Sequence, residues 1–330
     1  MIKVHRFNSF AQVSVSLYLN LDFDSKCLLQ AIFRDVGLRV VQRDGKMVFR
    51  GVQGECWECL SKLIDKTVKL AAQSKDVEEK ARDEAFLILR KNFKPGAIPA
   101  FIATRFQEKI REITGNPDPF LELKREEIKV AKSLAEWLRP RFENNLRSLF
   151  SFSALGNALD FFRDPEELKK DGETGLQFSI DDLDKVEELI SKNKGIILLL
   201  ADNAGEIYFD MPVLEYLLEM GCKPFYVVKG GPAQNDLTID DVKWAGYEQS
   251  RVPIVSHGSS VVGLDLNKVS DEFKKLFDEA TLIVGKGMGH YETMSHLALD
   301  KNILFLLKAK CNPVAGSLGV NKDEFVAYWG

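Results

Sequence analysis

The spacing of apolar residues divides the chain into a helical part and a later part of a different kind. From Glu55 to about Phe162, apolar positions recur at the three- and four-residue spacing of amphipathic helices. The clearest series are Cys59, Leu63, Val68, Leu70 and Ala71, and then Ala81, Ala85, Leu89 and Phe93. Breaks at Pro95–Pro99 and Asn116–Pro119 separate the helices, and Pro140 interrupts a third helical stretch over 120–149. We therefore expect a helical region over residues 47–175 that ends in the polar loop 163–174.

After Ser179 the apolar residues gather into short continuous runs separated by helix-like segments. The runs are Gly195–Ala201, Pro224–Val228, Val252–Val255, Thr281–Val284 and Ile303–Leu306. Runs of strand length that alternate with helices are typical of a parallel sheet covered on both faces. One helix is expected over 180–191 and another from about Thr238. The fold class expected for residues 176–330 is therefore α/β, with a mostly parallel sheet in a three-layer α/β/α domain that follows an all-helical region.

Residues 1–46 show neither pattern and hold only short β-like stretches. Two interpretations stay open: a β-hairpin packed on the helical part, or an extension upstream of a true start at Met47. The first residues lack the basic, apolar and small-residue order of a signal peptide. No apolar run reaches the roughly 18 residues of a membrane helix. We therefore expect a cytoplasmic protein with no membrane partner.

Composition narrows the class of partner. The chain is 45% hydrophobic and 28% charged, which is typical of a folded globular protein. Lys and Arg total 45 against 49 Asp and Glu, so the chain lacks the basic excess of a nucleic-acid-binding domain, and no nucleic-acid partner is expected. The five cysteines are scattered and odd in number, which suits a reducing compartment better than a disulfide framework.

Three of the predicted strands end in polar loops that hold glycines. These loops are Ala201–Glu206, Lys229–Asp236 and Gly285–Glu292. Ligands of parallel α/β sheets bind outside the carboxyl ends of the strands, so we expect the three loops to form one site. Carboxylate and amide oxygens suit a hard divalent cation, whereas glycine amides and a lysine suit phosphate. Together the loops indicate a metal and phosphate site.

Each loop also has a simpler interpretation when taken alone. Asp202–Asn203 is a common helix N-cap, Asp236 is placed to cap the helix expected from Thr238, and a lysine between glycines is common in exposed turns. The Gly285–Gly289 loop lacks the Walker spacing, and no strand leads into a Gly-x-Gly-x-x-Gly fingerprint at the expected place. These absences disfavour an NTPase and a nicotinamide-dependent dehydrogenase.

Several motifs in order resemble the DUF89 family of damage-control phosphatases. They are ECWECL, SFSALGNALDFF, DNAGE, VVKGGPAQND, GKGMGHYET and LLKAKCNPVAGSLGV, spread from Gly54 to the C-terminus. The resemblance implies a metal-dependent phosphatase that has a helical N-terminal part and an α/β C-terminal domain. The paired cysteines suggest the prokaryotic-type branch of the family.

The resemblance also assigns roles to individual residues. It implies one divalent metal ion (Mn, Ni, Co or Mg) with Asp202, Asn203 and Asp236 as ligands. Lys286 and the backbone amides of Gly287 and Gly289 would contact the phosphate. Asp202 and Lys286 are the expected catalytic residues, and whether Asp202 is a nucleophile or only a ligand stays open.

Four further residues are implied as substrate contacts or supports. Asn157 and Asp160 lie three residues apart on one helix face, which we expect to close over the strand-end loops; a solvent-facing pair is the alternative. Glu206 would contact the substrate or support the ligands. His290 stands where many members of the family have Asn, so a substrate contact, an acid role and a buried supporting role all stay open.

Cys56 and Cys59 have three open interpretations: structural packing, which we favour, a redox pair, or a metal site that lacks nearby partners. The expected function is hydrolysis of small phosphorylated metabolites by a divalent-metal-dependent phosphomonoester hydrolase. One alternative is an S-adenosylmethionine-dependent carboxyl methyltransferase, which is disfavoured because the first loop has a single glycine followed by Glu206. The other is a non-catalytic protein that binds phosphometabolites.

Overall fold

The computed structural model describes residues 47–158 and 176–330, and Val48–Gly330 form one compact unit. The expectations for residues 1–46 and for Asp160 lie outside the described residues. The division at residue 175 stays a prediction. Among the described residues, no helix is long and apolar enough to cross a membrane.

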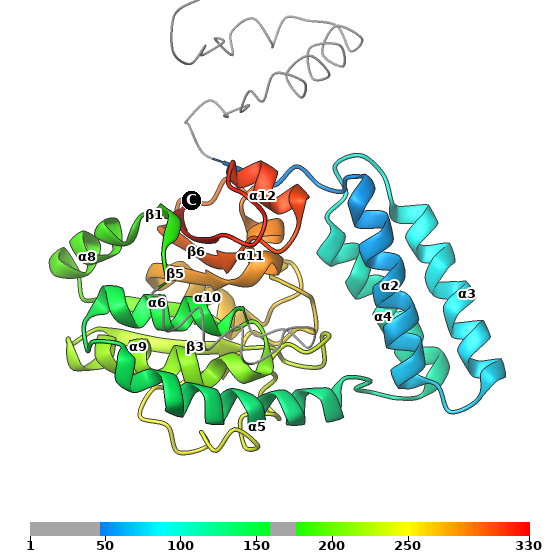
Figure 1. Ribbon diagram of the computed structural model, residues 1–330, viewed down its shortest axis with the longest axis horizontal. Helices are drawn as coiled ribbons and strands as arrows, with labels where there is room; N and C mark the ends of the chain where they lie inside the picture. Colours follow the sequence, from blue (N-terminus) through cyan, green and yellow to red (C-terminus); the bar gives the residue numbers. More distant parts are fainter. Residues whose placement is uncertain (1–46, 159–175) are drawn as a thin grey trace, which may run out of the picture. The chain divides into compact units, whose positions relative to one another are not determined.

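Helices α2 (Gly54–Ala71), α3 (Lys75–Asn92) and α4 (Pro99–Thr114) lie side by side (Figure 1). They bury one apolar cluster that includes Ile64, Leu89 and Phe106. The breaks between them fall at the predicted prolines: α3 ends before Pro95, and α4 begins with Pro99 in its first turn, where a missing N–H costs nothing. The helical pattern read from the sequence is confirmed here.

Helix α5 (Leu121–Leu138) ends in a short 3₁₀ turn, η2 (Arg139–Arg141), which contains Pro140. Helix α6 (Leu146–Gly156) then begins at Asn145, whose side chain accepts a hydrogen bond from the backbone N–H of Ser148 at 2.8 Å. Pro140 therefore divides the third predicted helical stretch in two, because it cannot donate the backbone hydrogen bond that a continuous helix requires.

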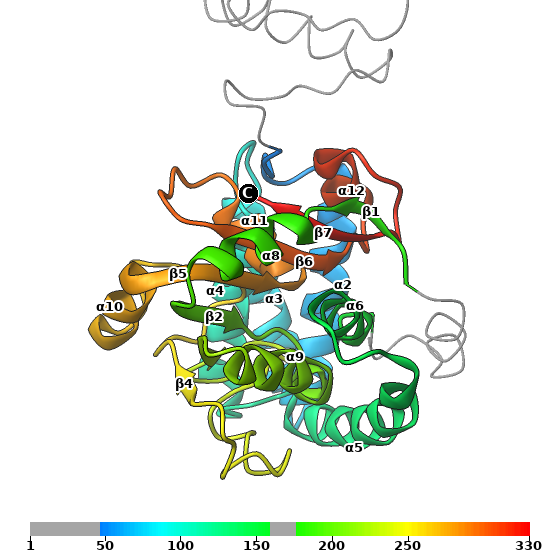
Figure 2. The ribbon, with the colours of Figure 1, turned by 90° about the vertical axis from the view of Figure 1, so that its left-hand side faces the viewer.

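The sheet has seven strands in the order β1-β7-β6-β5-β2-β3-β4 (Figure 2). The strands are β1 (Phe178–Asp181), β2 (Ile196–Leu200), β3 (Lys223–Val228), β4 (Ile254–Ser256), β5 (Ala280–Lys286), β6 (Ile303–Lys308) and β7 (Phe325–Trp329). Strands β2 to β6 are parallel to their neighbours among themselves, β7 runs antiparallel to β6, and β1 runs parallel to β7. The mostly parallel sheet is confirmed, and each of the five apolar runs contributes a strand.

Helices α8 (Leu183–Lys192), α9 (Ile207–Glu219), α10 (Asp271–Glu279), α11 (Gly287–Met294) and α12 (Asn312–Leu318) connect or follow the strands. The helix expected over 180–191 is confirmed, although it begins only at Leu183, because Ile180 and Asp181 belong to the short edge strand β1. Strand β7 was not expected, although it is a continuous apolar run that pairs with β6.

The expectation of a helix from Thr238 was wrong. Turns occupy this segment, and Asp241 organises them by accepting hydrogen bonds from the backbone N–H and the hydroxyl of Thr238 at 3.0 and 2.6 Å. The buried ammonium of Lys124, from α5, lies 2.6 Å from Asp241 and 2.7 Å from Asp118. Side-chain hydrogen bonds of this kind let Asp and Thr favour a turn over a helix.

The chain leaves the middle of the sheet in opposite directions. From β2 it passes through α9 to β3 on one side, and from β5 it passes through α11 to β6 on the other. Because parallel crossovers are right-handed, α9 and α11 cover opposite faces of the sheet. The carboxyl ends of β2 and β5 therefore form a topological switch point, where ligands of such sheets bind.

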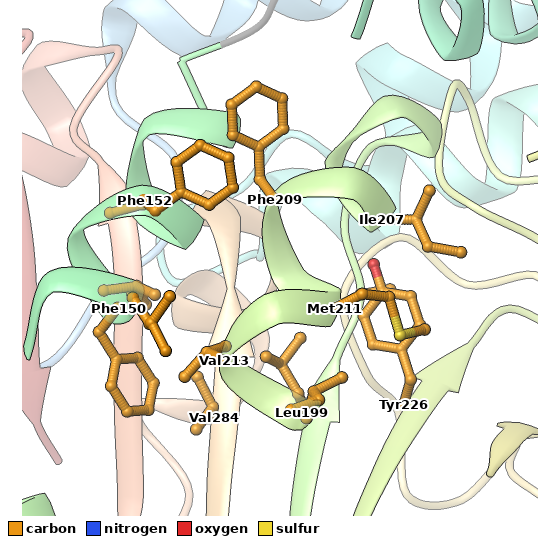
Figure 3. Close-up of a cluster of buried hydrophobic side chains, with 14 of the residues drawn as sticks. Phe150, Phe152, Leu199, Ile207, Phe209, Met211, Val213, Tyr226 and Val284 are labelled. Atoms are coloured by element: carbon orange, nitrogen blue, oxygen red, sulfur yellow. The ribbon is translucent and has the colours of Figure 1, made fainter. Parts of the chain in front are cut away.

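The face of the sheet under α6 and α9 holds the larger apolar core (Figure 3). Leu199 and Val284 of the strands lie near Val213 of α9, and the rings of Phe152 and Phe209 pack with their centroids 4.8 Å apart. Alternate residues of a strand share a face, so Lys286 follows Val284 toward these two helices. This geometry decides where the side chain of Lys286 lies.

Candidate functional site at the switch point

The candidate site lies where β2, β3 and β5 end next to one another. Strand β2 pairs in parallel with both β3 and β5, so the three polar loops begin at the same edge of the sheet. The first two loops are also joined by backbone hydrogen bonds: Leu237 donates to the carbonyl of Asp202 at 2.9 Å, and Ala204 donates to the carbonyl of Asn235 at 2.9 Å. Asn203 and Asp236 face each other as an isolated β-bridge. The loops are thus held together before any ligand binds.

The carboxylate of Asp202 is held by amides from two elements. Asn157, at the end of α6, donates through Nδ2 to Oδ2 of Asp202 at 3.0 Å and to Oε1 of Glu206 at 2.8 Å. Its own Oδ1 accepts the backbone N–H of Lys308 at 3.1 Å. The side chain of Asn157 is buried and engaged at both ends of its amide. In this structure it orients two carboxylates, and its predicted contact with the substrate stays a prediction.

Asn203 serves the loop and the site together. It is the N-cap of the 3₁₀ turn η3 (Ala204–Glu206), and it forms a capping box with Glu206. Its Nδ2 donates to Oε1 of Glu206 at 2.6 Å and lies 3.3 Å from Oδ2 of Asp202, whereas its Oδ1 accepts from Asn235 at 2.7 Å. The simple N-cap interpretation is therefore correct for Asn203.

Asp236 faces the site from the loop after β3. Its Oδ2 lies 3.4 Å from Nζ of Lys229, which also donates to the carbonyl of Gly263 at 2.5 Å. Oδ2 of Asp236 is buried, and its ion pair with Lys229 is longer than an ordinary hydrogen bond. Lys229 therefore compensates the carboxylate only in part, which would suit a further cation.

Lys286 lies beneath the site, on the face covered by α6 and α9. Its Nζ is fully buried and lies 2.5 Å from Oδ1 of Asp210 and 2.8 Å from Oε2 of Glu206. It also donates to the carbonyl and hydroxyl oxygens of Ser153 at 2.8 and 3.0 Å. An ammonium has three hydrogens, so these four oxygens occupy all of them. The predicted contact of Lys286 with phosphate stays a prediction, and in this structure its ammonium neutralises two carboxylates.

Gly287 brings the backbone of α11 against Asp202. Its φ is +73°, and a Cβ built at this position would stand 1.9 Å from Oδ2 of Asp202. Both the left-handed backbone and the lack of space require glycine. The first residues of α11 therefore lie directly at the Asp202 carboxylate. Gly289, in the same turn, is partly buried.

His290 is buried beside this turn, and its Nδ1 lies 2.6 Å from the carbonyl of Lys286. Nδ1 must carry the proton in that contact. Burial, together with the charge of Lys229, lowers the pKa of His290 to about 3. The imidazole is therefore neutral near pH 7, which argues against the acid role among the open interpretations.

The electrostatics of the loops show an excess of negative charge. Burial raises the pKa of Asp202 well above its ordinary value, and the charges of Asp236 and Glu206 raise it further. Burial also raises the pKa of Asp236 to about 6, although Lys229 opposes this rise. Burial alone would lower the pKa of Lys286, but the charges of Asp210 and Glu206 outweigh it and raise that pKa. Two carboxylates at the sheet edge are therefore costly to ionise together without a further cation.

These features fit a hard divalent cation. The oxygen donors at the edge are two carboxylates and one amide, the ligand types that such cations take. Among the described residues, no group of three or more His, Cys, Asp or Glu side chains is arranged to hold a metal ion. A cation here would therefore depend on the amide of Asn203 and on ligands that do not come from the protein.

Lys310 was not singled out in the sequence, although it lies in the quoted motif LLKAKCNPVAGSLGV. It follows β6, so it belongs to the same sheet edge, and its charge lowers the pKa of Asp202. It lies four residues after the apolar run Ile303–Leu306, so the reasoning applied to the other strand ends would have identified it. Its charge therefore acts on the candidate site from the residues that follow β6.

The cysteines lie away from the three loops in sequence, and the described ones are free thiols. Cys56 is buried in the first turn of α2, where its Sγ accepts the backbone N–H of Gln53 at 3.4 Å, and Cys59 is exposed. Burial raises the pKa of the Cys56 thiol. The capping contact supports the packing interpretation for Cys56.

Comparison with known proteins agrees with this geometry. A damage-control phosphatase of Pyrococcus horikoshii is 34% identical over 280 residues, which cover 83% of this chain and 96% of that protein. A damage-control phosphatase of Archaeoglobus fulgidus is 34% identical over 286 residues, covering 82% and 96%. A crystal structure of a DUF89 family protein from P. horikoshii has a TM-score of 0.76 at 32% identity and covers 84% of this chain and 98% of that one.

The family model for the damage-control phosphatase ARMT1-like domain matches residues 52–326, a span that runs from just before α2 into β7 and includes all three loops. The match, the relatives and the fold agree, so this chain belongs to the damage-control phosphatase ARMT1-like family.

Proposed function

We propose that the protein is a divalent-metal-dependent phosphatase that hydrolyses phosphomonoesters of small metabolites. The observation that carries this proposal is the pair of carboxylates at the switch point, Asp202 and Asp236, whose pKa values are both raised. A binding module for a phosphorylated ligand would gain nothing from two carboxylates there, since they repel phosphate. A cation between them reverses that repulsion. A cytoplasmic location belongs to the same proposal.

Asp202, Asn203 and Asp236 would hold the cation. When bound, a divalent metal supplies Lewis-acid polarisation of a phosphoryl oxygen and a template for in-line displacement. Asn157 keeps Oδ2 of Asp202 in place, and the capping box keeps Asn203 in place. The ligands are therefore positioned by contacts that exist in the folded chain itself, which reduces the reorganisation needed on binding.

Phosphate oxygens would be met by the backbone at the start of α11 and by Lys310. The N-terminal end of a helix offers free N–H groups and a favourable dipole to an anion. The glycine at position 287 allows this backbone to approach Asp202 closely. Lys310 adds a positive charge at the same edge. Donors of this kind stabilise the charge that develops on the transferring phosphoryl group.

Lys286 would act from below the site. Its ammonium compensates the buried carboxylates of Glu206 and Asp210, and Glu206 in turn accepts hydrogen bonds from Asn157 and Asn203. Without the charge of Lys286, the hydrogen bonds that Glu206 accepts from Asn157 and Asn203 would weaken. The amides of these two residues orient the metal ligands. Lys286 would therefore affect catalysis through the ligands, without touching the phosphate.

A metal and substrate screen tests the proposal directly. The purified chain is stripped of metal and assayed for release of inorganic phosphate from a panel of phosphorylated metabolites, with Mn²⁺, Ni²⁺, Co²⁺ or Mg²⁺ added. We expect phosphate release that requires an added cation and is abolished in the Asp236→Asn variant. Equal phosphate release by that variant, or full activity of the stripped protein in chelator, would overturn the proposal.

A further inference from the structure

Helix α5 contacts two loops of the switch point through the carboxyl group of Glu127. The side chain is partly buried, and it accepts two hydrogen bonds from two different loops of the site. The backbone N–H of Gly205 donates to its Oε1 at 3.2 Å, and Nδ2 of Asn235 donates to its Oε2 at 3.1 Å. Gly205 lies in the loop after β2 and Asn235 in the loop after β3, so Glu127 ties together the two loops that carry the candidate metal ligands.

The packing of α5 leaves little freedom for this contact. A Cβ built on Gly205 would stand 2.7 Å from Cβ of Ala131 and 3.0 Å from Cγ of Glu127. The turn η3 therefore lies directly on α5, one helical turn along from Glu127. This close packing limits movement of the turn toward the helix, and it keeps Glu127 beside Gly205.

A series of side-chain hydrogen bonds connects Glu127 through Asn235 to Asn203, and Asn235 is the donor in both of its contacts. Burial raises the pKa of Glu127 to about 8, and the hydrogen bonds from Asn235 and Gly205 oppose that rise because they favour the ionised form. In that form both oxygens of Glu127 only accept, so Asn235 presents its Nδ2 to Glu127. The same Nδ2 donates to Oδ1 of Asn203 at 2.7 Å. On its other side, Asn203 presents Nδ2 to Oε1 of Glu206 at 2.6 Å. Glu127 and Glu206, at the two ends of this series of contacts, thus set the orientation of the amides of Asn235 and Asn203.

We infer that Glu127 is a positioning residue, which fixes the amide of Asn203 through Asn235 so that Oδ1 of Asn203 is the atom offered to a cation. The inference rests on the proposed metal site. An amide that turned by 180° would offer an NH₂ group, which cannot bind a metal. Glu206 and Asp202 oppose that turn from one side, where they accept from Nδ2 of Asn203, and the pair Glu127–Asn235 opposes it from the other.

Exchange of Glu127 for Gln tests the direction of these bonds while keeping the shape of the side chain. A Gln amide has one acceptor and one NH₂ group, so it cannot accept from both Gly205 and Asn235. Either Gly205 loses its partner, or Asn235 turns and places its oxygen against Oδ1 of Asn203. We expect the Glu127→Gln variant of the full chain to bind Mn²⁺ about 10- to 100-fold more weakly by titration calorimetry, the range typical for residues that hold metal ligands.

Glu126→Gln is the matched control. Glu126 is the neighbouring residue on α5, is exposed, and pairs with Lys129 on the helix surface at 2.6 Å. It should leave Mn²⁺ affinity unchanged. Both variants are first checked for a cooperative unfolding transition without metal, so that a folding defect is seen separately from a loss of metal affinity.

A double-mutant cycle with Asn235→Ala separates a positioning role from a purely structural one. If Glu127 acts through Asn235, Glu127→Gln should change Mn²⁺ affinity little in the Asn235→Ala background, since residues in one network are not additive. Fully additive losses, or unchanged affinity in Glu127→Gln alone, would overturn the inference. Failure of the wild-type chain to bind any divalent cation would instead overturn the proposed function.

Discussion

The backbone at Gly287 lies against the carboxylate of Asp202: a Cβ atom at position 287 would stand 1.9 Å from Oδ2 of Asp202. The two residues follow the adjacent strands β5 and β2, and the chain leaves those strands in opposite directions. This contact places the start of a helix, with its free N–H groups, beside the carboxylate proposed to hold a metal. The fold therefore brings a cation ligand and an anion-binding element to one point.

Replacing Gly287 with alanine should abolish most of the phosphatase activity. The new methyl group would displace Asp202 and would also force alanine into a φ of +73°, so the metal ligand moves and the start of α11 is strained. A displacement of about 1 Å at a catalytic group can cost about 100-fold in rate. Steady-state phosphate release measures this loss. Gly316→Ala in α12 is the control, because nothing lies within 4 Å of its added Cβ, and it should keep wild-type activity. Equal activity of the two variants would contradict the assignment of Gly287.

Replacing Asp202 with asparagine should separate stability from function. The ionised carboxylate lies close to the charges of Asp236 and Glu206, so its removal relieves repulsion in the metal-free chain. We expect the metal-free variant to be at least as stable as wild type in urea unfolding, while activity falls by about 1,000-fold, the upper range for loss of one transition-state contact. Added Mn²⁺ should stabilise wild type but not the variant. A variant that Mn²⁺ stabilises as much as wild type would show that Asp202 is not a ligand.

The loops that carry the site could be read from the sequence because they follow buried strands. Continuous apolar runs such as Ile196–Leu200 mark where a strand ends, and the polar residues after them fall at the sheet edge. The direction of the Lys286 side chain was not predicted from the sequence. It lies within the same loop motif, but as the last residue of β5 it follows the two-residue alternation of the strand toward α6 and α9. The direction of the Lys286 side chain thus depends on which residues of β5 face α6 and α9.

Other features depend on contacts between distant residues and could not be read from one sequence. The turn around Thr238 forms because Asp241 accepts its hydrogen bonds and because Lys124, more than a hundred positions earlier, neutralises Asp241. The role of Glu127 likewise depends on where α5 lies relative to Asn235. The edge strand β1 is only four residues long and half-buried in an alternating pattern, so its sequence runs directly into the helical pattern of α8.

Replacing Lys286 with methionine should first destabilise the protein. The change leaves Glu206 and Asp210 buried without their cation, and removal of one partner from a buried ion pair costs about 3–5 kcal/mol. The free energy of unfolding, measured in urea without metal, checks this. The double variant Lys286→Met/Asp210→Asn removes one of the stranded charges and should recover part of the loss. A stable single variant that has lost activity but kept Mn²⁺ affinity would instead support the direct phosphate contact implied by the family resemblance.

The affinity for a divalent cation should rise with pH between about pH 5 and pH 8. In the metal-free chain the pKa of Asp236 is raised to about 6 and that of Asp202 is raised well above its ordinary value. A carboxyl whose pKa is raised by folding is favoured in its protonated form. It stabilises the folded state relative to its ionised form at low pH, and that contribution is lost as the pH rises through the folded pKa. Protons and the cation compete for the same oxygens, so the cation binds more tightly once these protons leave.

The melting temperature measured with and without Mn²⁺ across this pH range tests whether the affinity rises or falls with pH. The metal-free chain should lose stability toward high pH, in part through Glu292, whose pKa burial raises to about 8. The difference that Mn²⁺ makes isolates the site from this background, and it should grow with pH in wild type and stay near zero in Asp236→Asn. A difference that shrinks as the pH rises would contradict carboxylate ligands at this sheet edge.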